Sequence, residues 1–220
     1  YYKTTNSEEL KYSIRSIAKN LLINNLYIVG DKPQWLKESN KCKYIFSTRD
    51  DKIGLGSVSI QHLYNFFTKS DENDIIMFND DFFILNQVDT LNDYFRYDID
   101  YELKARLHKQ YNEMTMKSLL LTQEQKKYNL HIPMSINRNN FSELYNIWMT
   151  LKDKNIDFRT LYGNMFLHSI NGMNDCKIFS LNEVPTNETF ISTTNASFNM
   201  GNTGNYIKEK FNIPTIFEML

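Results

Sequence analysis

The feature that most constrains the fold is a helical pattern followed, within a few residues, by a short apolar run. Residues 6 to 22 predict a helix with one apolar stripe, formed by Leu10, Ile14, Ile17, Ala18 and Leu21. Asn6 is its expected cap, and Glu9 holds the capping-box position. Residues 26 to 29 then predict a buried strand that ends at Gly30. A helix joined so closely to a strand is half of an α/β unit.

The same alternation continues along the first half of the chain. Residues 43 to 46 predict a short strand and residues 57 to 69 a helix. Residues 74 to 78 (DIIMF) form the strongest strand pattern, and their apolar run is typical of the middle of a sheet. Residues 82 to 85 continue extended.

Helical patterns dominate the second half, although the part from Phe179 onward mixes short strands, polar loops and a helix. They cover residues 101 to 121, 140 to 153, 158 to 170 and a segment near 203 to 211, and Asn140 with Glu143 is the expected cap of the second. No Pro/Gly/Ser linker separates the halves. We therefore expect one domain over residues 1 to 220, with an α/β half (1 to 95) and a mostly helical half (96 to 220).

Composition excludes several function classes. The net charge is -1, so no global positive field favours nucleic acid or an anionic membrane. Two distant cysteines, Cys42 and Cys176, exclude a cysteine-based zinc site and indicate a reducing compartment. No apolar run approaches the length of a membrane span. No glycine-rich phosphate loop is present. We expect a soluble cytoplasmic protein.

Asn79-Asp80-Asp81 is the sharpest candidate site. It follows the predicted buried strand, and ligands of open α/β sheets gather at the carboxyl ends of strands. Adjacent buried carboxylates repel each other, and a bound cation relieves that repulsion. Mg²⁺ commonly takes one or two carboxylates and completes its shell with water and phosphate oxygens. The alternative interpretation is a plain turn, which Asn and Asp favour.

Three further residues are candidates. His131, between two predicted helices and before Pro133, is a candidate general base, with helix capping or packing as the alternative. Arg159 begins a helix and has the planar fork of a phosphate clamp, with a surface ion pair as the alternative. Arg15 lies beside the core position Ile14. It is expected to brace Asp80 or to contact a phosphate, with a structural ion pair as the alternative.

These segments resemble conserved blocks of the Stealth proteins, sugar-phosphate transferases of capsule synthesis with phage relatives described as glycosyltransferases. The resemblance rests on residues 9 to 17 (ELKYSIRSI), 26 to 31 (LYIVGD), 33 to 36 (PQWL), 76 to 83 (IMFNDDFF), 131 to 133 (HIP) and 158 to 159 (FR). Their order and spacing agree across about two thirds of the chain, over residues 8 to 160. The family's acidic Val-Asp-Gly-type opening motif has no counterpart in residues 1 to 5.

The resemblance implies a GT-A-like (Rossmann-like) mixed sheet flanked by helices. It implies a nucleotide-sugar donor, Mg²⁺ or Mn²⁺ as the cofactor, and a bacterial or phage-infected cell as the setting. Asp80 and Asp81 would hold the metal or diphosphate, with Asn79 beside them. Arg15 would be a donor-site residue, His131 a base and Arg159 a phosphate clamp.

The sequence therefore predicts a metal-dependent transferase. It would move a sugar or a sugar phosphate to a hydroxyl acceptor, which could be a glycan, a wall polymer or a modified nucleic acid. Two alternatives stay open. A non-catalytic carbohydrate- or nucleotide-binding module would keep the fold without the opening acidic motif, and a metal-dependent phosphohydrolase would use the same acids with water as acceptor.

Overall fold

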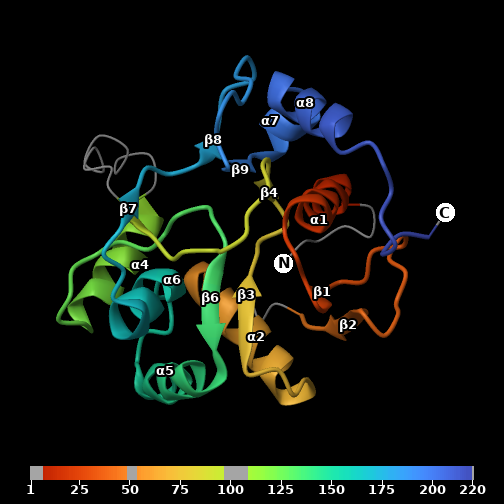
Figure 1. Cartoon of the computed structure of the whole chain (residues 1–220). Helices are drawn as coiled ribbons and strands as arrows, with labels where there is room; N and C mark the ends of the chain where they lie inside the picture. The colour runs from red at the N-terminus through yellow and green to blue at the C-terminus, as the bar shows by residue number, and fades with distance from the viewer. Residues whose placement is uncertain (1–6, 49–53, 97–108, 220) are drawn as a thin grey trace.

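The computed structural model describes residues 7–48, 54–96 and 109–219. Its helices are α1 (Glu8–Asn20), α2 (Val58–Lys69), α4 (Lys109–Leu120), α5 (Arg138–Thr150), α6 (Phe158–Tyr162), α7 (Asn195–Asn199) and α8 (Asn202–Lys210), with helical turns at Leu55–Ser57 and Gly163–Leu167. Its strands are β1 (Leu26–Gly30), β2 (Cys42–Phe46), β3 (Asp74–Met77), β4 (Phe82–Ile84), β5 (Phe95–Arg96), β6 (Met134–Asn137), β7 (Gly172–Met173), β8 (Lys177–Ile178) and β9 (Phe190–Thr193). The chain is thus a mixed α/β protein (Figure 1).

The first predicted helix is confirmed, with a different cap. The Ser7 hydroxyl accepts a hydrogen bond from the Leu10 amide at 3.2 Å, so α1 begins one residue after Ser7. The expected cap, Asn6, lies outside the described residues. Leu10, Ile14 and Ile17 are buried, as their spacing predicts. Glu9 does not close a capping box, because its carboxylate accepts a hydrogen bond from the Thr193 hydroxyl instead.

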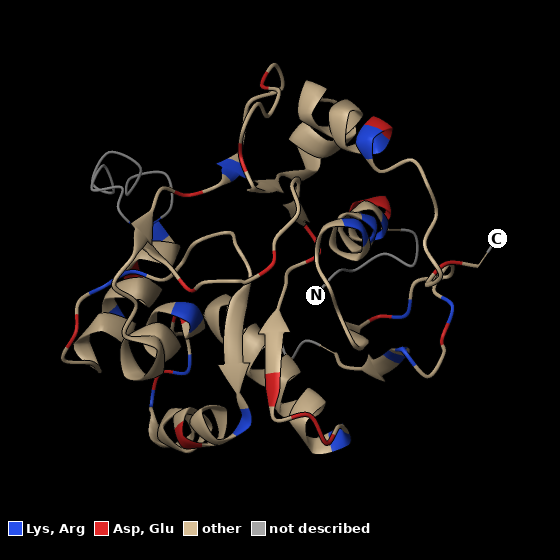
Figure 2. Cartoon of the chain, viewed as in Figure 1, with Lys and Arg blue, Asp and Glu red and all other residues tan. Residues whose placement is uncertain are grey.

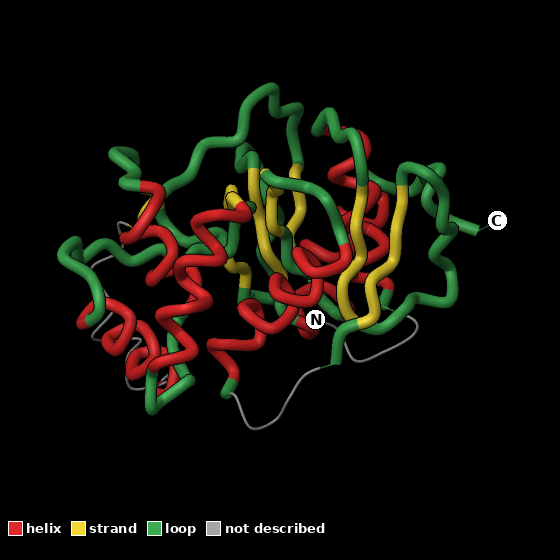
Figure 3. Tube along the Cα trace, turned by 90° about the horizontal axis from the view of Figure 1, so that it is seen from below, coloured by secondary structure: helices red, strands yellow, loops and turns green. Residues whose placement is uncertain are grey.

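The strands form small separate sheets rather than the expected single mixed sheet. β1 and β2 pair in parallel, β3 and β6 pair antiparallel, β4, β9 and β8 form a three-stranded sheet, and β5 pairs with β7. Figure 3 shows the strands in separated groups with helices packed on them. The described residues therefore support a mixed α/β class, and the GT-A-like sheet is not confirmed.

The prediction that residues 74 to 78 form a buried central strand was wrong in its burial. β3 pairs with β6 on one edge, and the side chain of Ile76 is 42% exposed. The physical reason is a cavity between β1 and β3, which leaves the second edge of β3 without a neighbouring strand in the described part of the chain.

The two expected halves share their sheets. β6 pairs with β3, and β9 pairs with β4, so strands from beyond residue 96 complete those of the first half. Of the helix predicted over 101 to 121, residues 109 to 120 form α4, and residues 101 to 108 lie outside the described residues. The cap of α5 is Asn137, whose side-chain oxygen accepts hydrogen bonds from two backbone amides, and not the expected Asn140. The helix predicted over 158 to 170 consists of α6 and a wider helical turn that ends at His168, where φ is 46°.

Three groups of buried side chains hold these elements together. The largest lies among α2, α5, α6 and β6 and includes Leu63, Leu144 and Leu161. A second joins α1 and β1 to Phe217 near the end of the chain. A third packs α7 and α8 on the three-stranded sheet. None of the described helices is both long enough and apolar enough to cross a membrane.

Charged side chains of both signs are mixed over the elements (Figure 2). The guanidinium of Arg138 donates to the backbone oxygens of Phe67, Ser70 and Glu72, and Lys126 donates to the Ser169 oxygen. These basic groups therefore brace loops through backbone oxygens.

Candidate functional site at the turn after strand β3

The Asn79-Asp80-Asp81 segment forms a turn that connects β3 to β4. The Phe82 amide donates to the Asn79 oxygen at 3.3 Å, which closes the turn. β4 is fully buried behind it and packs on α1, so the turn is held rigidly from one side. The tripeptide is therefore a turn, as the alternative interpretation predicts, and this turn carries two adjacent carboxylates.

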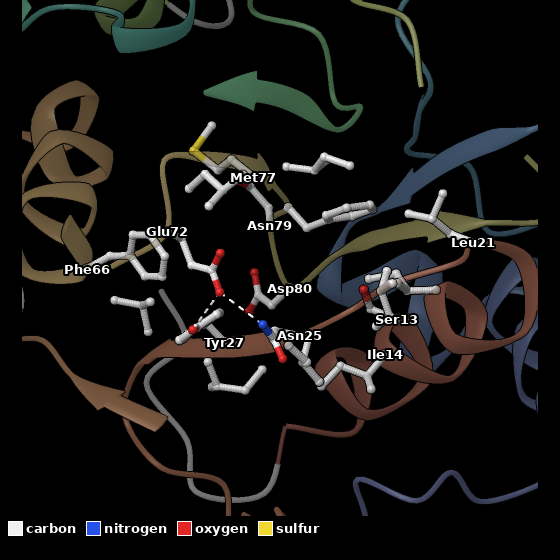
Figure 4. Close-up of a pocket in the computed structure, with 18 of the residues that line it drawn as sticks. Ser13, Ile14, Leu21, Asn25, Tyr27, Phe66, Glu72, Met77, Asn79 and Asp80 are labelled. Carbon is white, nitrogen blue, oxygen red and sulfur yellow. Dashed lines mark hydrogen bonds between the residues drawn. The ribbon is translucent and has the colours of Figure 1, made fainter. Parts of the chain in front are cut away.

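The two carboxylates point to different surroundings. Asp80 lines the cavity between β1 and β3, where Figure 4 shows its carboxylate among the lining side chains. Asp81 turns toward β8 and β9, where its Oδ2 accepts from the Lys177 ammonium and, at 3.0 Å, from the Ser192 hydroxyl. Its Oδ1 is buried and has no hydrogen-bond partner among the described residues. Asp80 and Asp81 thus do not converge on one point as a pair.

Glu9 adds a third carboxylate to this turn. It lies in the first turn of α1, and burial raises its pKa to about 7, with further contributions from the charges of Asp81 and Asp80. Burial also raises the pKa of Asp80, and repulsion by Asp81 acts in the same direction. Lys177 lowers both pKa values but does not offset these effects. The site therefore carries more carboxylates than its cations balance.

His131 belongs to an oriented pair with Asp175. Its Nδ1 lies 2.8 Å from Asp175 Oδ1, and its backbone amide donates to the same oxygen at 3.2 Å. Arg96 lies 3.4 Å from the other carboxylate oxygen. Burial would raise the pKa of Asp175, but the hydrogen bond from His131 and the charges of His131 and Arg96 hold it below its usual value. A carboxylate at Nδ1 leaves Nε2 as the nitrogen that can accept a proton.

Arg159 lies over the ring of Phe82. Its guanidinium carbon is 5.2 Å from the ring centroid, and its Nη1 donates to the Ile132 oxygen at 2.8 Å. Among the described residues its Nη2 is buried without a hydrogen-bond partner. Burial lowers the pKa of Arg159 to about 10, which leaves it charged at neutral pH, and the nearby carboxylates limit the fall. The His131 ring meets the same Phe82 edge-on, with centroids 6.2 Å apart.

The structure therefore brings together Asp81, His131 and Arg159 around Phe82, with Asp80 on the cavity side of the turn. The lining of that cavity includes Asn79 and Asp80 but neither His131 nor Arg159.

Arg15 does not join this group, and its predicted contact with Asp80 is not what the described residues show. Its guanidinium forms a bidentate ion pair with Glu218, at 2.9 Å and 2.6 Å, and also donates to the Phe211 oxygen at 3.1 Å. The structural ion pair, the alternative interpretation of Arg15, is what the structure contains. The cause is the path of the C-terminal segment, which returns to α1 (Figure 1).

Sequence reasoning missed Glu9, Lys177 and Asp175 as members of the site. In the sequence, Glu9 occupies a capping-box position, and that role already accounts for an acidic residue there. Its spacing therefore does not indicate that it belongs to the site. Asp175 lies 44 residues from His131, and Lys177 lies 96 residues from Asp81. No spacing rule connects positions so far apart, since only the tertiary fold brings them together.

The chemistry of these groups fits a divalent cation at the turn. Across residues 7–48, 54–96 and 109–219, no three His, Cys, Asp or Glu side chains are arranged as a complete metal site. However, the buried Asp81 Oδ1 lacks a donor within the described ranges, and the neighbouring carboxylates of Glu9 and Asp80 have raised pKa values. A cation with one or two protein ligands, completed by phosphate oxygens and water, suits that arrangement.

No protein-family model matches the chain, and no curated protein matches its sequence.

Proposed function

We propose that the chain is a metal-dependent transferase with a nucleotide-sugar donor, acting at the turn that carries Asp80 and Asp81, in a GT-A-like fold. The observation that carries the proposal is the burial and mutual repulsion that raise the pKa values of Glu9 and Asp80, beside a buried Asp81 oxygen that has no donor among the described residues. A divalent cation relieves that excess of negative charge, and a nucleoside diphosphate supplies its remaining ligands.

In this proposal Asp80 and Asp81 would hold Mg²⁺ or Mn²⁺, with the Asp80 carboxylate turning from the cavity toward the Asp81 Oδ1. When bound, the metal would neutralise the charge of the diphosphate leaving group. Lys177 holds Asp81 in place, since its ammonium contacts the Asp81 carboxylate and also the Ser192 hydroxyl at 3.1 Å. Arg159 offers a buried N–H group to phosphate oxygens as negative charge develops on them.

His131 is the proposed base. Its Nε2 accepts the proton of an acceptor hydroxyl while the hydroxyl oxygen forms a bond to the transferred group and the nucleotide leaves. Asp175 is a positioning residue, because it fixes the ring through Nδ1 and stabilises the protonated imidazole. Attack at the anomeric carbon would transfer a sugar, and attack at the β-phosphorus would transfer a sugar phosphate. The acceptor class, a glycan, a wall polymer or a modified nucleic acid, follows only from the resemblance.

A thermal-shift screen tests the donor site. The chain is heated with UDP-glucose, UDP-N-acetylglucosamine, GDP-mannose and the matching free nucleotides, each with and without Mn²⁺. A ligand at 100 times its Kd stabilises the native state by about 2.7 kcal/mol, which raises the Tm of a chain of this size by roughly 5 to 10 °C. We expect a shift that requires both a nucleotide diphosphate and metal.

Two variants and a control sharpen the screen. Asp80→Asn and Asp81→Asn should abolish the metal-dependent shift, whereas Asp153→Asn, which alters an exposed pair with Lys117, should keep it. Asp80→Asn should leave the ligand-free Tm unchanged or higher, because burial disfavours the Asp80 charge. A folded chain without any nucleotide shift would refute the proposal and favour the non-catalytic binding module. Release of free sugar phosphate with water as the only acceptor would favour the phosphohydrolase.

A further inference from the structure

The cavity beside Asp80 lies between the edges of two strands. It has a volume of about 560 Å³ and is lined by β1 and β3, by Leu10, Ile14 and Ile17 of α1, and by Leu63 and Phe66 of α2. Figure 4 shows side chains from these elements around one space. At one end, Glu72 accepts hydrogen bonds from Asn25 and Tyr27 at 3.0 Å and 2.9 Å, which links the two strands across the gap.

The hydrogen-bond register shows which backbone groups of β1 face this cavity. The Leu26 amide donates to the Lys41 oxygen, and the Ser47 amide donates to the Gly30 oxygen. In a parallel ladder, alternate residues bond to the same neighbour, so Leu26, Ile28 and Gly30 bond to β2. The N–H and C=O groups of Tyr27 and Val29 point to the opposite edge, and both residues line the cavity.

β3 shows the same arrangement on the opposite wall. The Arg138 amide donates to the Asn73 oxygen, and the antiparallel register then assigns Ile75 and Met77 to the ladder with β6. The main-chain groups of Asp74 and Ile76 point away from β6, and both residues line the cavity. Within the described residues, two strand edges therefore present backbone donors and acceptors to one apolar space.

We propose that this cavity is a docking site for one extended segment, about five residues long, of a partner polypeptide, which joins β1 and β3 into a continuous sheet. An unpaired strand edge presents a row of N–H and C=O groups to another strand, and an inserted strand offers partners along both of its edges at the same spacing of about 3.3 Å per residue. The aliphatic and aromatic walls from α1 and α2 select apolar side chains on that strand. A small ligand would satisfy only some of these groups. Addition of a strand to an exposed edge is a known mode of peptide recognition.

Amide hydrogen exchange measured by NMR tests this proposal on the chain itself. In the chain alone, the amides of Tyr27, Val29 and Ile76 should exchange at least about tenfold faster than those of Ile28 and Met77, because the described part of the chain offers them no ladder partner. The probe is a capped peptide of sequence Lys-Val-Ile-Val-Val-Ile-Lys. It should slow exchange at Tyr27, Val29 and Ile76 by at least about tenfold and leave β2 unchanged.

The control peptide carries proline at the central position, which removes a ladder donor, and it should give no protection. Equal protection of the two sets of amides in the chain alone would overturn the proposal, since β1 and β3 would then already be paired. Protection that rises with the concentration of the chain alone would assign the cavity to a second copy. Lack of protection by the Val/Ile peptide at millimolar concentration, or protection by a nucleotide sugar instead, would likewise overturn it. These outcomes do not depend on the proposed transferase activity.

Discussion

Replacement of Arg15 by methionine should destabilise the chain strongly without affecting a donor site. The guanidinium and the Glu218 carboxylate form two direct hydrogen bonds, and their side chains are only 7% and 2% exposed. Arg15→Met leaves the Glu218 charge buried without its main partner, and breaking a buried pair in this way costs about 3 to 5 kcal/mol. Lys11, 3.5 Å from Glu218, and the Thr215 amide offset part of that cost, so we expect about 3 kcal/mol.

Urea unfolding followed by circular dichroism measures this change, with the midpoint and the slope fitted separately. Lys19→Met is the matched control. It lies on the same helix, and its exposed ammonium contacts the Lys210 oxygen at 3.4 Å and lies 5.6 Å from the Phe211 ring centroid, so a change within about 1 kcal/mol is expected. In a double-mutant cycle with Glu218→Gln, the coupling between the two sites should be about 2 kcal/mol or more. A cost below about 1 kcal/mol for Arg15→Met, together with loss of nucleotide binding, would refute the structural role.

The remaining predictions concern the candidate site and one close backbone contact. Glu9 binds its proton more tightly in the folded chain, where its pKa is about 7, so the stability that this proton contributes is lost as the pH rises from about 4.5 to 7. Glu9→Gln removes the titrating group and should therefore flatten the fall of Tm over that pH range. A Tm profile unchanged from that of the parent chain would contradict this. Asp175→Asn should lower transfer activity by about 10- to 100-fold and shift its pH dependence, because His131 loses its orienting carboxylate; an unchanged profile in acceptor assays would exclude the pair from the reaction. Gly204→Ala should cost about 1 to 3 kcal/mol, since its added Cβ would meet the Phe198 oxygen at 1.7 Å; a Tm equal to that of the parent chain would show that α7 and α8 can separate freely.

The elements near the start of the chain were predictable because their signals are local. α1, β1, β2 and α2 lie within a residue or two of their predicted bounds, since apolar spacing reports which face of a helix or strand is buried. Helix caps were less predictable. Several Asn and Ser residues crowd the same segments, and only the backbone geometry decides between Asn137 and Asn140.

The apolar run of β3 shows why burial and pairing were harder to predict. Its side chains suit the centre of a sheet, but its neighbours lie far away in sequence: β6 on one side and the cavity on the other. A run of apolar residues indicates that both faces of a strand can be buried, but it does not indicate which elements cover those faces.

The sequence by itself determined the mixed α/β class, the helix and strand pattern of the first half, and a carboxylate-bearing turn after an apolar strand. Only the tertiary structure decided that Glu9 and Lys177 join that turn, that Asp175 orients His131, and that Arg15 belongs to Glu218. The physical reason is that propensity and periodicity act between neighbouring residues, whereas charge pairing depends on distances in space that chain spacing does not encode.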